Sequence, residues 1–203
     1  MDAAQLFLQD HARVHSAAVA EPEGVPLEDV VLGGLSDEQV RQRPAEDLNS
    51  LAWLVWHMAR CEDAAINTVV AGRRQVIEED NWMERLGLAR ADIGTGMTDD
   101  EVSDFSARVD IAGLRAYRAA VGRRTREVVQ ALAPDAWERP ISDDDLERAV
   151  AAGLIGENAG WVQGFWAGKT TAWFISWLAG GHSYWHLGEA MCVRSQAGLG
   201  LPI

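Results

Sequence analysis

Apolar residues recur along this chain at intervals of three and four residues, whereas alternating runs of Val, Ile, Thr and aromatic residues are missing. The first pattern is typical of helices and the second would indicate strands. The helical spacing predicts four long helices, over residues 2–20, 47–71, 111–133 and 170–196. Helices with apolar faces bury those faces against one another. We therefore expect an all-α fold, a four-helix bundle with additional short helices, in which residues 1–203 form a single domain.

Capping residues and helix breakers predict how the rest of the chain is divided. Two pairs match the capping box that begins a helix: Ser36 with Gln39, and Thr98 with Glu101. Residues 73–97 predict a loop with one or two helical turns. Residues 137–168 contain a short helix followed by regularly spaced glycines, a pattern that we interpret as a mobile flap. Gly180 and Gly181 are expected to disturb the last helix.

The charge balance excludes several classes of partner. Lys and Arg total 18 against 31 Asp and Glu, a formal net charge of -13. Such a chain is repelled by nucleic acid and by anionic lipid surfaces, so we expect a small-molecule substrate and no nucleic acid. Residues 170–188 carry no charge but include His, Gly, Thr and Ser, which indicate a buried helix rather than a membrane span. No membrane association is expected.

The N-terminus and the cysteines predict a cytoplasmic location. The chain begins MDAAQLFLQDHARVH, without the basic and apolar leader of a signal peptide. Its two cysteines, Cys61 and Cys192, are far apart and form no CxxC motif, which fits a reducing compartment. Each is interpreted as a small buried thiol. Cys61 has an alternative interpretation, a fourth metal ligand or a thiol near the substrate, because it lies one turn from His57.

Three histidines carry the strongest chemical signal. His182 and His186 are four residues apart, so both imidazoles lie on one face of the last helix. His57 lies on the interior stripe of the second long helix. A third nitrogen from a facing helix would complete a site with one open coordination position, as catalytic zinc sites have. Imidazole suits zinc, nickel, copper or iron. The alternative is that each is a hydrogen-bonded core histidine.

Further residues are weighed beside these three. Glu189, one turn beyond His186, is a candidate either to accept a ring N–H or to act as a general base. Trp161 and Trp166 are candidates to line a substrate entrance. His11 and His15 form a competing pair four residues apart, but we interpret the first as half-buried and the second as solvated. Arg118 is assigned to the charged side of the third long helix.

The order of three segments resembles that of a known family: GLSDEQVRQRP, then LNSLAWLVWHMARCED, then GGHSYWHLGEA. It is similar to the DinB-like, or YfiT-like, metalloenzyme superfamily, which includes thiol-dependent S-transferases and mycothiol-dependent maleylpyruvate isomerases. The resemblance implies one ligand on the second helix of a four-helix bundle, at His57. It implies two more ligands, His182 and His186, in an HxxxH motif that is followed by Gly188. The stretch 137–168 is longer than in the simplest members, which leaves the pocket and substrate open.

Three functions follow as hypotheses. The first is a transferase that uses a divalent metal ion, zinc or nickel, to activate a low-molecular-weight thiol. The second keeps the same site but places water in the open position, giving a hydrolase with Glu189 as base. The third is a metal-stabilised stress-response module without enzymatic activity. An apolar bundle face with exposed Trp also leads us to expect a homodimer.

Overall fold

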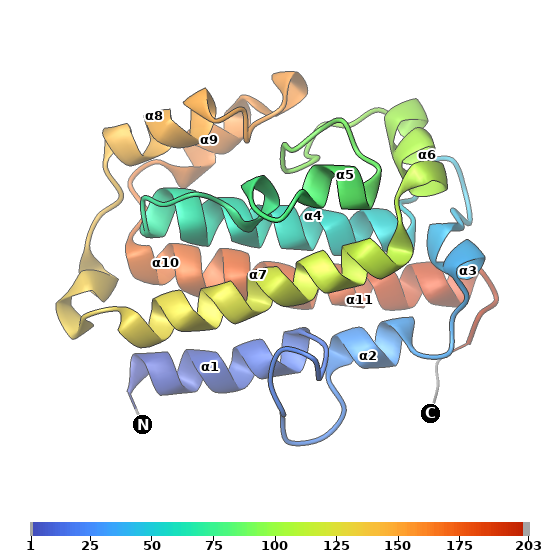
Figure 1. The fold of residues 1–203 in the computed structure, drawn as a ribbon, viewed down its shortest axis with the longest axis horizontal. Helices are drawn as coiled ribbons and strands as arrows, with labels where there is room; N and C mark the ends of the chain where they lie inside the picture. The colour runs from blue at the N-terminus through green and yellow to red at the C-terminus, as the bar shows by residue number, and fades with distance from the viewer. Residues whose placement is uncertain (1, 201–203) are drawn as a thin grey trace.

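The computed structural model describes residues 2–200, which fold into a bundle of long helices with roughly parallel axes (Figure 1). The long helical units are α1 (Ala3–Val14), α4 (Leu51–Asp63) with η1 (Ala64–Val70), α7 (Ile111–Ala131), and α10 (Thr171–Ser176) with η5 (Trp177–Gly181) and α11 (His182–Gln196). The shorter elements are α2 (Leu27–Leu32), α3 (Asp37–Arg41), η2 (Val76–Glu78), α5 (Trp82–Leu86), α6 (Asp99–Arg108), η3 (Pro134–Glu138), α8 (Asp143–Ala151), η4 (Glu157–Ala159) and α9 (Trp161–Trp166). No strand occurs within residues 2–200. The predicted all-α four-helix bundle is confirmed.

The second long helix is the centre of the bundle. Every residue from Leu51 to Val70 is buried, because this segment packs against α7, α11, α6 and α8. Its almost continuous apolar sequence is what a helix surrounded by other elements requires. After Asp63 the helix widens into the π-helical segment η1, a local change that is frequent near functional sites.

The predicted helix starts are accurate where a capping box marks them. The Ser36 side chain accepts from Gln39 N, and the Thr98 side chain accepts from Glu101 N. The prediction for the first helix is wrong at its end, because α1 stops at Val14 rather than near residue 20. His15 adopts an extended backbone, and the chain then turns. The backbone N–H of Ala17, just after this turn, donates to Asp29 Oδ2.

The glycine-rich stretch folds onto the bundle as two short helices. α8 begins at a capping box formed by Ser142, and it packs on η1 and α9. Leu154, Val162 and Trp166 from this stretch are buried in the same apolar cluster as the first turns of the last long helix. Figure 1 shows α8 and α9 at one end of the bundle, beside α4 and α10. This placement brings α9 next to the last helix.

The uncharged segment 170–188 buries one face in the interior of the bundle and exposes other positions, among them Trp185. Phe174, Ile175 and Leu178 are buried there, and η5 interrupts the helix at the two glycines, as predicted. Gly181 lies under the ring of Trp177, where a Cβ atom would be 2.9 Å from the indole. Within residues 2–200, no helix combines the length and the apolar character needed to cross a bilayer.

Candidate metal centre

The three predicted histidines come together between α4 and α11. One potential ligand nitrogen from each of His57, His182 and His186 lies within 4.8 Å of the other two. His182 Nε2 and His186 Nε2 are 3.1 Å apart, one helical turn along α11. The π-helical segment η5 ends directly before His182 and therefore sets the direction in which this histidine pair faces. Their role as metal ligands stays a prediction.

Two of the three imidazoles are held by hydrogen bonds through the ring nitrogen Nδ1. His57 Nδ1 donates to the carbonyl oxygen of Ile93 at 2.5 Å, and Trp53 stacks on the same ring. His186 Nδ1 donates to Glu189 Oε2 at 2.7 Å. A proton on Nδ1 leaves the lone pair of Nε2 free, and carbonyl or carboxylate partners of this kind orient histidine ligands in metal sites. The imidazole nitrogens of the three histidines therefore suit ions such as zinc, nickel, copper or iron.

Two of the three histidines, His57 and His182, are neutral near neutral pH. Burial, followed by the neighbouring His186, lowers the pKa of His57 to about 4. Burial and the two adjacent imidazoles also lower the pKa of His182 well below its usual value. A metal ion does not have to displace protons from such residues before it binds. Three uncharged nitrogens would leave the charge of a divalent ion uncompensated.

Glu189 supports the histidine cluster from one side. Its Oε2 accepts from His186 and its Oε1 accepts from Asn49 Nδ2 at 3.0 Å. Burial by itself would raise the pKa of Glu189, but these two hydrogen bonds outweigh burial and lower it. Both carboxylate oxygens are thus engaged. This geometry matches the first role predicted for Glu189, acceptor of a ring N–H, more closely than the role of a free base.

A cavity of about 480 Å³ opens beside the histidines, and both tryptophans predicted for the entrance line it. Trp166 is 1% exposed and forms part of the wall, whereas Trp161 is 63% exposed. Cys61 also lines the cavity, with Sγ 3.8 Å from both ring nitrogens of His57. Burial raises the pKa of Cys61 to about 12, so it is a protonated thiol and a poor metal ligand. The buried interpretation is confirmed for Cys61 and wrong for Cys192, which is exposed.

The prediction for the competing histidine pair is wrong. His11 and His15 are both 0% exposed, and each Nε2 lies 2.9 Å from one oxygen of Glu62, itself fully buried. Gly122 on α7 makes room for this arrangement, since a Cβ atom there would be 2.7 Å from His15 Nδ1. The position of each histidine on α1 did not reveal the partner, because Glu62 belongs to α4.

Arg118 is the second correction in this region. It was assigned to a charged helix surface, but it is 0% exposed and donates to Glu62 Oε2 at 3.1 Å and to Glu28 Oε2 at 3.2 Å. It also donates to Ser183 Oγ, next to His182. His11, His15 and Glu62 are close enough to hold an ion, but the Arg118 cation already neutralises this carboxylate and repels a second cation. We assign this buried network a structural role.

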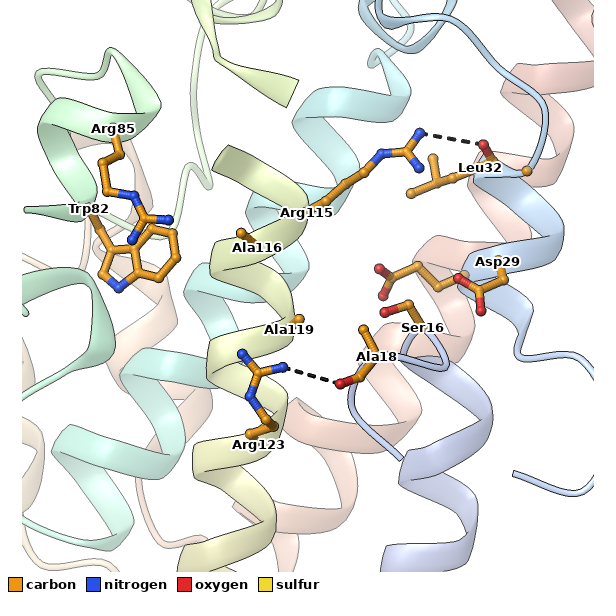
Figure 2. A pocket seen from close by; sticks show the side chains of 12 residues that line it. Ser16, Ala18, Asp29, Leu32, Trp82, Arg85, Arg115, Ala116, Ala119 and Arg123 are labelled. Atoms are coloured by element: carbon orange, nitrogen blue, oxygen red, sulfur yellow. Dashed lines mark hydrogen bonds between the residues drawn. The ribbon is translucent and has the colours of Figure 1, made fainter. Parts of the chain in front are cut away.

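A larger cavity, of about 860 Å³, lies over α7 and shares no lining residue with the histidine cavity (Figure 2). Arg115 and Arg123 reach across it from α7 and donate to the carbonyl oxygens of Leu32 and Ala18, at 3.5 and 3.2 Å. The third arginine, Arg85, stacks on Trp82 at 3.7 Å from the ring centroid. Arg115 and Arg123 therefore join α7 to neighbouring segments, whereas the Arg85 contact lies within α5.

The comparisons with known proteins agree with this fold. The sequence model of the DinB superfamily matches residues 29–190, which include the three histidines and Glu189 but not His11 or His15. The chain belongs to the DinB superfamily. A crystal structure described as the conserved protein of locus from Enterococcus faecalis is 18% identical, with a TM-score of 0.70 over 97% of this chain and 98% of that one. At this identity the likeness shows the fold alone. No curated protein matches the chain.

Proposed function

We propose that His57, His182 and His186 hold a divalent metal ion, zinc or nickel, and that the protein is a transferase acting with a low-molecular-weight thiol. The observation that carries this proposal is the convergence of three imidazoles, two of them oriented through Nδ1, at the wall of a cavity of about 480 Å³. The family resemblance supports the choice of a thiol as cosubstrate.

The chemistry divides between the ion and the side chains. A divalent ion held by His57, His182 and His186 would lower the pKa of a bound thiol, so that its sulfur becomes a nucleophile at neutral pH. The sulfur would then form a bond to an electrophilic atom of the second substrate. The bond from that atom to the leaving group would break, and the leaving group would depart with its electron pair and take up the proton lost by the thiol. Ile93 O and Glu189 keep the rings of His57 and His186 oriented, and the apolar cavity wall excludes water.

Two other functions remain as proposals at the same site. A hydrolase would activate water instead of a thiol, but its predicted base, Glu189, has both oxygens engaged by His186 and Asn49. A non-enzymatic module would use the ion only to join α4 to α11. The homodimer and the cytoplasmic location also stay predictions from the sequence.

The first experiment measures the metal content of the natively purified protein and of alanine variants at the three histidines. We expect about one equivalent of zinc or nickel in the native protein and little in His57→Ala, His182→Ala and His186→Ala. His11→Ala is the matched control, because it removes a buried histidine outside the site. Full metal content in all three site variants would refute the proposal.

A softer change tests the supporting hydrogen bond. Glu189→Gln removes the charge that accepts from His186, and losses of about 10–100-fold in metal affinity are typical of such changes. The measurement is a competition titration with a chromogenic chelator. An unchanged affinity would show that Glu189 does not support the metal ligands.

The reaction is tested with the metal-loaded protein. Glutathione, mycothiol and bacillithiol are each added with a model electrophile, and loss of the electrophile is followed with and without the protein. Acceleration by a thiol that disappears in His57→Ala supports the transferase. Thiol-independent cleavage of esters or phosphoesters would favour the hydrolase instead. A large loss of thermal stability on chelation, with no turnover of either kind, would favour the non-enzymatic module.

A further inference from the structure

Exposed aromatic rings gather at the mouth of the histidine cavity. Trp161 and Phe165 on α9 are 63% and 43% exposed, and Trp185 on α11 is 66% exposed. All three line this cavity. Large apolar side chains that are exposed together, rather than singly, mark a surface that binds something. These rings come from two elements more than fifteen residues apart in the sequence, so the fold has assembled them at this opening.

The aromatic surface continues inward to the histidines. Trp185 lies nearly parallel to the ring of His186, with an interplanar angle of 15° and 6.4 Å between centroids. Trp177 meets Trp185 edge to face at 5.9 Å, and the buried Trp166 forms part of the inner wall. Planar rings therefore line the path from solvent to the histidines. Aromatic ligands pack on such rings in offset-stacked or edge-to-face geometry.

The cavity wall offers little to a charged molecule. Among its lining residues, all of which belong to the described part of the chain, none is Lys or Arg, and Glu189 is the one acidic residue. The oxygens of Glu189 already accept from His186 and Asn49. An anionic ligand body would find no basic side chain in this wall, and a cationic one would find no free carboxylate, so either would lose its hydration without gaining a partner. The remaining wall is apolar, with Ile93, Val162 and Leu178 beside the aromatic rings.

We infer that the second substrate of this site is an uncharged, planar aromatic molecule that enters between the rings of α9 and α11. The status of this molecule as a substrate rests on the proposed function, but its binding depends on Trp161, Phe165 and Trp185. The cavity volume of about 480 Å³ lies in the range of roughly 300–1,000 Å³ that holds small molecules. Trp161 and Phe165 determine the preference for aromatic ligands, and the histidines lie at the inner end.

The test measures binding rather than turnover. The probes are three molecules with the same ring system: neutral 2-naphthamide, anionic 2-naphthoate and cationic 2-naphthylmethylammonium. Isothermal titration is performed on the metal-free and the metal-loaded protein. We expect 2-naphthamide to bind both forms, and to bind the metal-free form more tightly than either charged probe does. Trp161→Ala and Phe165→Ala should each weaken its binding by about tenfold, the effect of losing one aromatic contact.

The control variant is Leu6→Ala, which removes an exposed apolar side chain on α1, 54% exposed and outside the cavity. It should bind 2-naphthamide as the native protein does. Circular dichroism verifies that the variants keep their helices, which is expected because the substituted side chains are exposed. Equal or tighter binding of either charged probe to the metal-free protein, or unchanged binding in both aromatic variants, would overturn the inference. If the protein takes up no zinc or nickel but still binds 2-naphthamide, the proposed function is wrong and this inference stands.

Discussion

Glu62→Gln tests the buried network most directly, because Glu62 accepts three hydrogen bonds in the bundle interior. His11 Nε2 and His15 Nε2 lie 2.9 Å from its two oxygens, and Arg118 donates to it at 3.1 Å. Burial alone would raise the pKa of Glu62, but the two histidines outweigh burial and hold it well below the usual value, so the group is ionised. Glutamine keeps the size of the side chain but removes the charge and replaces one acceptor with a donor.

The expected cost follows from these contacts. Hydrogen bonds to charged groups contribute about 1.5–3 kcal/mol each, and glutamine keeps part of the three. Removing one member of a buried ion pair costs about 3–5 kcal/mol, because the remaining charge loses its partner. We expect the free energy of unfolding to fall by about 3–5 kcal/mol. At a urea m-value of roughly 2–3 kcal/mol per M, the midpoint falls by roughly 1–2.5 M.

The assay is urea unfolding followed by circular dichroism and by tryptophan fluorescence. Glu127→Gln is the matched control, because Glu127 is on the surface of α7 with 68% of its side chain exposed, and it should change stability by less than about 0.5 kcal/mol. If Glu62→Gln unfolds within about 0.5 kcal/mol of the native protein, the assigned structural role of the network is wrong.

Three further predictions concern pH, backbone strain and thiol reactivity. Burial and the Arg118 charge lower the pKa of His15 from 6.5 to about 3. Below pH 6.5 the unfolded chain therefore takes up a proton that the folded protein does not, and thermal stability should fall steadily as the pH decreases. Constant thermal stability from pH 7 to 4.5 would contradict this. Gly94→Ala should cost about 3 kcal/mol in urea unfolding, since φ is +78° and the new Cβ atom would meet the buried ring of Trp56, whereas Gly153→Ala, with φ +66° and open space, should cost about 1 kcal/mol. A colorimetric thiol reagent should react with one cysteine of the native protein, the exposed Cys192, and with both only after unfolding; rapid reaction of two thiols would contradict the burial described.

Local features of the sequence predicted the local structure well. The capping boxes at Ser36 and Thr98 begin helices where expected, because the hydrogen bonds involved join residues three positions apart. The spacing of His182 and His186 predicted that they share one helix face for the same reason. α1 ends at Val14, and the following segment makes a hydrogen bond from Ala17 N to Asp29 of α2, a contact that no local signal in the sequence reports.

The errors for His11, His15 and Arg118 share one cause. His11, His15 and Arg118 were judged by their positions on their own helices, as polar residues that tend to face water. Each is buried because a charged or polar partner from another helix offsets the cost of removing it from solvent. A polar residue at the edge of an apolar stripe carries no sign of such a partner in its own segment.

The sequence by itself determined the all-α class, most of the long helices and the interior helix face on which His57, His182 and His186 lie. These properties depend on hydrophobic periodicity and on hydrogen bonds within about one turn. The tertiary structure alone decided that His57 meets His182 and His186, more than a hundred residues away, and that a loop carbonyl at Ile93 orients its ring. It also decided that α9 places its aromatic rings over the histidines. Such contacts arise from the packing of whole helices, in which the shapes and charges of every neighbour act together.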